Sequence, residues 1–201
     1  MASLLQSPLK ALLAGVAIAA ALLVATLAGT GTGIDAIGLV AVLTRWLHVG
    51  AGIIWLGMIW FVNWIQLVAI AEADQPARGA IMKHIVPRVA ATFRHTSHLT
   101  IATGAVLLVT SGYLGGSLIY SSAVFIPTSR NIAMWAATLG ALVMYMFVHM
   151  MIWPGLRVVL GIEKADADAV AAARAKVATY ARLNLVLAVP VTLGMIVAAH
   201  A

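Results

Sequence analysis

The stretch Arg45–Trp64, RWLHVGAGIIWLGMIWFVNW, decides the fold class of this chain. As a helix it is long enough to cross a bilayer, because about 20 residues rise about 30 Å. It nevertheless carries Arg45 and His48 near one end, followed by Gly50 and Gly52. An ionisable side chain at membrane depth is costly and indicates function by default. The rest of the chain has to show what these residues serve.

The composition indicates an integral membrane protein. The 201 residues are 63% hydrophobic and 9% charged, and the mean hydropathy is +1.05. A water-soluble domain of this size is far less apolar. The net charge of +6 does not point to nucleic acid, because the basic residues flank apolar segments. With no cysteine, the sequence excludes disulfides, iron–sulfur clusters and covalently attached CxxCH haem.

The apolar runs predict an all-α integral membrane protein, a bundle of five transmembrane helices in a single domain over residues 1–201. The predicted spans are residues 9–28, 46–69, 98–118, 132–153 and 183–199. The first run resembles a secretory signal but is long for one, so we interpret it as a span. The polar link after the second span predicts a short interfacial helix around Ile81. An amphipathic helix is expected to lead into the last span.

Basic residues set the expected orientation. If the spans alternate, ten Lys and Arg residues fall on one side and only Arg45 and Arg130 on the other. Because positive charge stays inside, the N terminus is expected in the cytoplasm and the C terminus outside, in a bacterial-type inner membrane. The lipid bilayer is therefore the first predicted partner.

Four tryptophans supply a depth scale, because Trp prefers the membrane interface. They flank the second and fourth spans as two pairs, Trp46 with Trp64 and Trp135 with Trp153. Each pair is 18 residues apart, which is about 27 Å at the helical rise. This length matches a hydrocarbon core of about 30 Å.

On this scale the histidines within the spans form two layers. His48 lies just inside the outer tryptophan of the second span, and His200 returns to the outer side at the end of the fifth span. His149 lies one turn before the inner tryptophan, and His98 lies one turn into the third span. His95, one turn earlier, competes with His98 for the inner layer.

Two layers of paired histidines fit one or two bis-histidine b haems, because neutral imidazole ligates iron and a helix bundle can bury the macrocycle. His48 with His200 would hold an outer haem, and His98 with His149 an inner one. Arginines stand near both layers as expected propionate partners: Arg45 outside, Arg94 and Arg157 inside. Gly52 lies one turn after His48, where the missing side chain makes room for a flat macrocycle or for a neighbouring helix.

Four segments resemble the membrane domain of PuuD-type urate hydroxylases, the urate oxidase N-terminal family. They are LTRWLHVGAGIIWLGMIWFVNW, FRHTSHLTIATGAVLLVTSGY with its T-x-x-x-G helix, MMIWPGLRVVLG and ARLNLVLAVPVTLGMIVAAH. The resemblance covers residues 43–200 and implies that the family positions are Arg45, His48, Asn184, Pro190 and His200. Family enzymes are longer and carry a c-type cytochrome domain, so this chain is expected to be a short form without it.

The predicted function is a membrane b-type haem protein that transfers electrons between a quinol or small reductant and a respiratory or cytochrome partner. One alternative is a urate hydroxylase-like oxidase of a small heterocycle, although the spans offer no carboxylate as general base. A second is a copper protein using His95, His98 and four methionines, Met144, Met146, Met150 and Met151. A third is a non-catalytic accessory subunit. The helix opening also resembles HemJ-type protoporphyrinogen oxidases and CopD-type copper proteins.

Overall fold

A computed structural model describes residues 6–31, 33–110 and 129–200, which form helices and no strand. Within these residues, four helical runs are long and apolar enough to cross a membrane: Pro8–Gly29, Ala36–Glu72, Ser129–Val159 and Ala167–His200. The predicted all-helical class is thus confirmed, and the four runs are compatible with a membrane protein; the predicted count of five spans stays a prediction. The predicted span 98–118 begins inside helix α6 (Val86–Thr110), and the rest of it lies outside the described residues.

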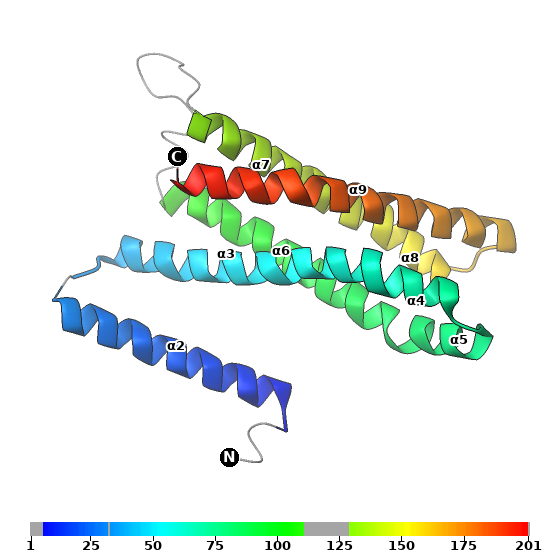
Figure 1. Cartoon of the computed structure of the whole chain (residues 1–201), viewed down its shortest axis with the longest axis horizontal. Coiled ribbons are helices and arrows are strands. Elements are labelled where there is room, and N and C mark those ends of the chain that lie inside the picture. The colour runs from blue at the N-terminus through cyan, green and yellow to red at the C-terminus, as the bar shows by residue number, and fades with distance from the viewer. Residues whose placement is uncertain (1–5, 32, 111–128, 201) are drawn as a thin grey trace. The chain divides into compact units, whose positions relative to one another are not determined.

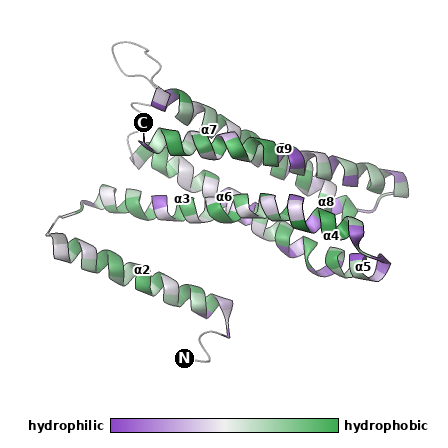
Figure 2. Ribbon diagram, in the orientation of Figure 1, coloured by the Kyte–Doolittle hydropathy of each residue, from purple (hydrophilic) through white to green (hydrophobic). Residues whose placement is uncertain are grey.

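The chain divides into two compact units, residues 1–40 and 41–201. The first contains α2 (Pro8–Thr30) and the start of α3 (Ala36–Phe61). Pro8 stands in the first turn of α2, where its missing N–H costs nothing, and Gly31 ends the helix at φ +62°. Most leucines of α2, and Ile18, are exposed, as lipid-facing side chains would be, and the helix is largely hydrophobic along its length (Figure 2). That the two units form one domain stays a prediction.

Residues 41–201 form a bundle of long helices (Figure 1). One helical run joins α3 to the π-helical turn η1 (Val62–Gln66) and α4 (Leu67–Glu72). A second joins α7 (Ser129–Met146), η3 (Phe147–Ile152) and α8 (Trp153–Val159). The short helix predicted around residue 81 is present as α5 (Gln75–His84). The amphipathic helix expected before the last span is also present, since α9 (Ala167–His200) runs through both without a break.

The two π-helical turns contain residues that account for their departure from regular α-helix. Pro154 follows η3 and has no N–H to donate, so the backbone before it departs from the regular α-helical pattern. In η1, the Asn63 amide donates to the Ile59 carbonyl at 2.9 Å and to the Ala181 carbonyl of α9 at 3.1 Å. That second bond ties the α3–α4 run to α9.

Helices α7 and α9 pack closely because small residues face each other. A Cβ on Gly194 would lie 3.0 Å from the Ala137 Cβ and 3.1 Å from the Ala133 carbonyl oxygen. A Cβ on Gly140 would lie only 2.5 Å from a methyl group of Val191. Small residues let membrane helices approach and gain dispersion energy where no hydrophobic effect drives association.

The buried core lies inside the bundle, while many large apolar side chains face outward. Trp55, Ile59, Met144 and Val148 are among the buried core residues. The tryptophans Trp46, Trp64 and Trp135, which set the depth scale, are by contrast exposed. Hydrophilic residues gather over α5 and the first half of α9 (Figure 2). This distribution is that of a protein whose outer surface meets lipid.

Candidate functional site

His48 on α3 is hydrogen-bonded to α6, where its partner Thr100 lies 52 residues further along the chain. Its ring Nδ1 lies 2.9 Å from the Thr100 carbonyl oxygen and 3.2 Å from Thr103 Oγ1. A carbonyl oxygen only accepts, so Nδ1 carries the proton and donates it. The Thr103 hydroxyl gives its own hydrogen to the Leu99 carbonyl. In the neutral ring, Nε2 therefore keeps its lone pair, the state in which histidine ligates a metal.

One glycine of α6 packs against the His48 ring, and two glycines of α3 do not contact it. A Cβ on Gly104 of α6 would lie 3.0 Å from His48 Cε1 and 3.4 Å from Nδ1, so glycine lets the ring pack against that helix. A Cβ on Gly50 would meet nothing within 4 Å, and one on Gly52 would meet only the Thr100 methyl group at 4.0 Å. Close helix packing thus does not require glycine at positions 50 and 52, whereas it does at 104.

His200 ends α9 and is exposed, and its Nδ1 donates to the Ile196 carbonyl at 2.9 Å. The Asn63–Ala181 bond fixes its level relative to His48, because α3 and α9 run in opposite directions (Figure 1). Fifteen residues separate Asn63 from His48, and fifteen separate Ala181 from Ile196. At the common helical rise, the carbonyl that holds the His200 ring lies near the level of His48.

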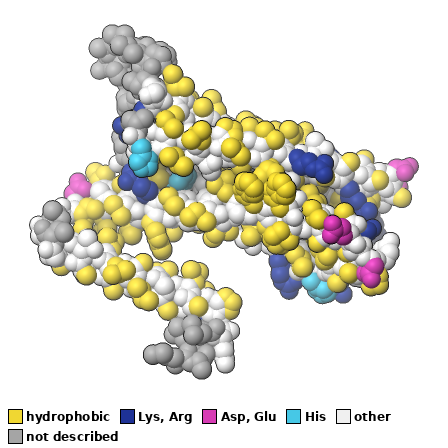
Figure 3. All heavy atoms as spheres, viewed as in Figure 1, with side chains coloured by type: hydrophobic (Ala, Val, Ile, Leu, Met, Phe, Trp, Pro, Cys, Tyr) yellow, Lys and Arg dark blue, Asp and Glu magenta, His cyan; other side chains and the backbone are white. Residues whose placement is uncertain are grey.

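The surroundings of His48 are basic. Arg45 lies one turn before it on α3 and is exposed. Figure 3 shows His and Lys or Arg side chains gathered on one face over α3, near the C-terminal end of α9. At the same end, Arg130 at the start of α7 joins that helix to α9, because its Nε donates to the Ala198 carbonyl at 3.2 Å. Anionic groups would be favoured at this end.

His98 and His149 form a cluster with Tyr145 and Ser97, which we call the His98–His149 cluster. The two imidazole centroids are 4.2 Å apart, and the Tyr145 ring lies 4.3 Å from that of His149. The Tyr145 hydroxyl is 2.8 Å from His98 Nδ1. Ser97 gives its hydrogen to the Arg94 carbonyl and accepts from His149 Nε2 at 3.0 Å. Imidazole rings whose centroids are this close leave no width for a macrocycle between them.

The remaining residues predicted for the inner layer lie apart from this cluster's rings. His95 is exposed, and within the described residues it makes no ring contact with His98 or His149. The Arg94 guanidinium stacks over the Trp153 ring, 4.0 Å from its centroid. Arg157 forms an ion pair with Glu163 at 2.7 Å.

The methionines predicted as copper ligands do not gather on one face. Met144 is fully buried in the apolar core, whereas Met146 and Met150 are exposed. Residues 6–31, 33–110 and 129–200 contain no group of three or more His, Cys, Asp or Glu side chains placed to hold a metal ion.

The partners of the histidines were not identified from the sequence. Thr100 and Gly104 hold His48, and Ser97 and Tyr145 hold the other two rings. One signal was available, because Thr100 and Gly104 are the two ends of the T-x-x-x-G pattern in the second quoted segment, FRHTSHLTIATGAVLLVTSGY. Tyr145 lies one turn before His149, but its hydroxyl contacts His98 on α6, and the spacing of residues along the chain does not predict that contact.

Three of the five positions implied by the family resemblance differ in their burial, hydrogen bonds or place in a helix. His48 is anchored across helices, and Asn184 is completely buried with no hydrogen-bond partner for its amide in the described part of the chain. Pro190 lies inside α9 without ending it. The resemblance itself stays a prediction. The chain matches no protein-family model, no curated protein and no solved structure.

Proposed function

We propose that the protein is a membrane b-type haem protein in which His48 and His200 are the axial ligands of one haem. The observation that carries the proposal is the bond from His48 Nδ1 to the Thr100 carbonyl. Histidines that ligate metals commonly donate their other ring nitrogen to a carbonyl or carboxylate, which fixes the ring and its tautomer. Here that donation reaches across two helices and leaves Nε2 available.

The second ligand is in the same chemical state. His200 also donates through Nδ1, so its Nε2 keeps a lone pair, and the carbonyl that it uses lies near the level of His48. Gly52 lies one turn after His48 on α3, and the space beside it suits a flat apolar group next to the first ligand. Arg45, one turn from His48, is suited to bind a propionate at the membrane surface.

The direct contact between the two imidazole rings of the His98–His149 cluster supports one haem rather than two. Axial ligands stand on opposite faces of a macrocycle, whereas these imidazoles contact each other directly. The cluster is better suited to join α6 to α7 and η3 through its two side-chain hydrogen bonds. We therefore assign it no iron.

Haem b supplies one-electron redox chemistry when bound. The chain's part is to fix the His48 ring, exclude water with the surrounding apolar helices and neutralise propionates with Arg45. We further propose five spans with the N terminus in the cytoplasm of a bacterial-type inner membrane, so that His48 and His200 lie near the outer surface. Electrons would pass between a quinol or small reductant and a respiratory partner.

The test is to quantify haem in the detergent-purified protein and to record its reduced-minus-oxidised spectrum. We expect about one haem per chain and a low-spin b-type α band, as two imidazole ligands require. A protein that binds no haem after supplementation with haem during expression would refute the proposal. Two haems per chain would refute our assignment of the His98–His149 cluster.

A further inference from the structure

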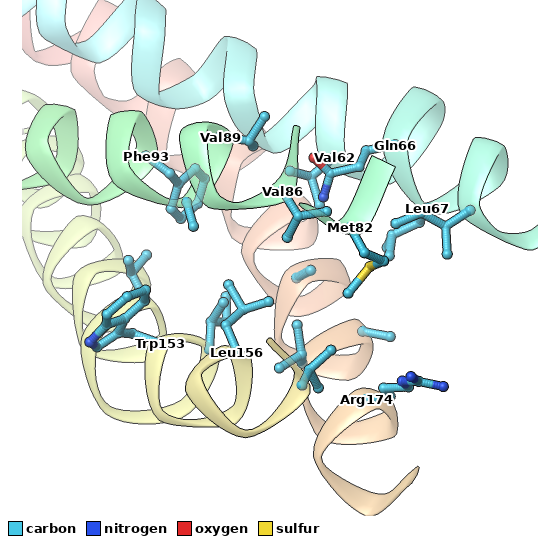
Figure 4. A pocket seen from close by; sticks show the side chains of 18 of the residues that line it. Val62, Gln66, Leu67, Met82, Val86, Val89, Phe93, Trp153, Leu156 and Arg174 are labelled. Carbon is cyan, nitrogen blue, oxygen red and sulfur yellow. The ribbon is translucent and has the colours of Figure 1, made fainter. Parts of the chain in front are cut away.

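A cavity of about 360 Å³ opens at the end of residues 41–201 that carries α5, far along α3 from His48. Residues from η1, α4, α5, α6, η3, α8 and α9 line it, and most of their side chains are drawn in Figure 4. Most of the lining is aliphatic or aromatic, as Val86, Phe93 and Leu156 illustrate. An interior of this kind suits hydrocarbon chains or another elongated apolar group.

The charges that line the cavity have one sign. Three arginines contribute to it, Arg78, Arg94 and Arg174, and the lining includes no aspartate or glutamate. Arg78 also donates to the Ile70 and Ala73 carbonyls, which keeps its guanidinium at the end of α4. Arg174 is exposed and lies at the edge of the cavity (Figure 4). This arrangement favours a ligand whose polar end is an anion.

Two buried polar atoms of the lining have no partner within the described residues. Gln66 is 8% exposed, and its Oε1 accepts no hydrogen bond. Its side chain extends from its helix toward Val86 (Figure 4). The buried Nε of Arg94 donates to nothing. Buried polar groups without a partner are costly. A ligand with a hydroxyl group could donate to Gln66 Oε1, and one with an acceptor oxygen could accept from Arg94 Nε.

We propose that this cavity binds an anionic phospholipid with a hydroxylated head group, of the phosphatidylglycerol class. The part of an acyl chain nearest the head group occupies the aliphatic interior, the phosphate faces the arginines, and a head-group hydroxyl is placed to donate to Gln66. Basic pockets between membrane helices recognise anionic lipids in this way. A neutral quinone would fill the apolar space but leave three guanidinium charges uncompensated. The site does not depend on the haem.

Native mass spectrometry of the purified protein with added lipids tests the proposal. Phosphatidylglycerol and phosphatidylcholine with the same acyl chains are titrated in parallel, and ubiquinone is added as a competitor. We expect phosphatidylglycerol to bind more tightly than phosphatidylcholine, and ubiquinone not to displace it. Arg174→Gln should weaken phosphatidylglycerol binding about fivefold, the effect of one basic residue near a lipid head group. Arg182→Gln, on the same helix but outside the lining, should have no effect.

A second pair of variants tests the apolar part without changing charge. Ala178 lines the cavity, and Ala178→Phe should fill it and reduce binding of both phospholipids. Ala175→Phe places the same side chain at an exposed position outside the lining and should leave binding unchanged. Equal binding of the two phospholipids, wild-type binding by Ala178→Phe, or displacement by ubiquinone would each overturn the proposal. Haem content, measured on the same samples, reports separately on the proposed function.

Discussion

The two regions that hold paired histidines differ in what the rings contact. His48 donates to a backbone carbonyl of a neighbouring helix, and Gly104 makes room for its ring. His98 and His149 instead contact each other and bond to side chains of Tyr145 and Ser97. In both arrangements each ring has one bonded nitrogen, but only in the second do two imidazoles pack against each other and join helices through side-chain hydrogen bonds.

This difference shows that the spacing of a histidine along the helices does not establish what its ring contacts. Both regions satisfy the same spacing rule in the sequence, since each holds two histidines near one level. The role depends on which direction the ring faces and on what its second nitrogen does. Four substitutions test the comparison, beginning with the largest expected effect.

His48→Ala removes a proposed axial ligand. We expect the haem affinity to fall by more than about 100-fold, because loss of a ligand should exceed the loss caused by removing its hydrogen-bond partner. Haem per chain, measured from the absorbance of the purified variant, gives the result. His84→Ala, on exposed α5, is the matched control and should keep the wild-type haem content. Normal haem content in His48→Ala would remove the basis for the comparison.

Gly104→Leu moves the His48 ring without changing the ring itself. The new side chain begins 3.0 Å from His48 Cε1, so the ring must shift and its bond to the Thr100 carbonyl is lost. We expect the haem affinity to fall by about tenfold, as for the loss of other outer-shell partners. Gly57→Leu is the control, because a Cβ at Gly57 meets nothing within 4 Å. Equal haem affinities in the two variants would contradict the assigned role of Gly104.

His149→Leu should affect stability but not haem content. It removes the bond to Ser97 and the ring contacts with His98 and Tyr145, which should cost about 1–2 kcal/mol. Thermal unfolding in detergent measures the loss of stability, and haem absorbance of the same sample measures occupancy. If this variant lost its haem while remaining folded, the two regions would not differ in the way we describe.

Tyr145→Phe is expected to have the smallest effect. It removes only the hydroxyl that lies 2.8 Å from His98 Nδ1 and retains the ring contact with His149. Side-chain hydrogen bonds between membrane helices contribute about 0.6 kcal/mol on average, so a slight fall in the unfolding midpoint should be the only change. A shift in the haem spectrum would indicate that the cluster acts on the redox centre.

Helix positions could be read largely from the sequence, because a bilayer demands long apolar helices. The run predicted at residues 9–28 is α2, Pro8–Thr30, and the predicted short helix around residue 81 is α5, Gln75–His84. The second run was predicted to end at residue 69 but extends to Glu72 through η1. The π-helical turn at Asn63 includes a hydrogen bond to Ala181 of α9, and the residues around Asn63 in the sequence do not predict a bond to so distant a residue.

Sequence alone determined the long apolar helices and the number of helical turns that separate each histidine from its neighbours, because composition and helical rise act along one chain. Tertiary structure decided which rings meet, since that depends on how each helix is rotated toward its neighbours. Thr100, Thr103 and Gly104 hold His48 only because α6 turns one face to α3. Along the chain, His48 and His149 are equivalent as polar residues in apolar helices. In three dimensions, one donates to a backbone carbonyl and the other lies tilted against a second imidazole, because packing between helices fixes the direction of each ring.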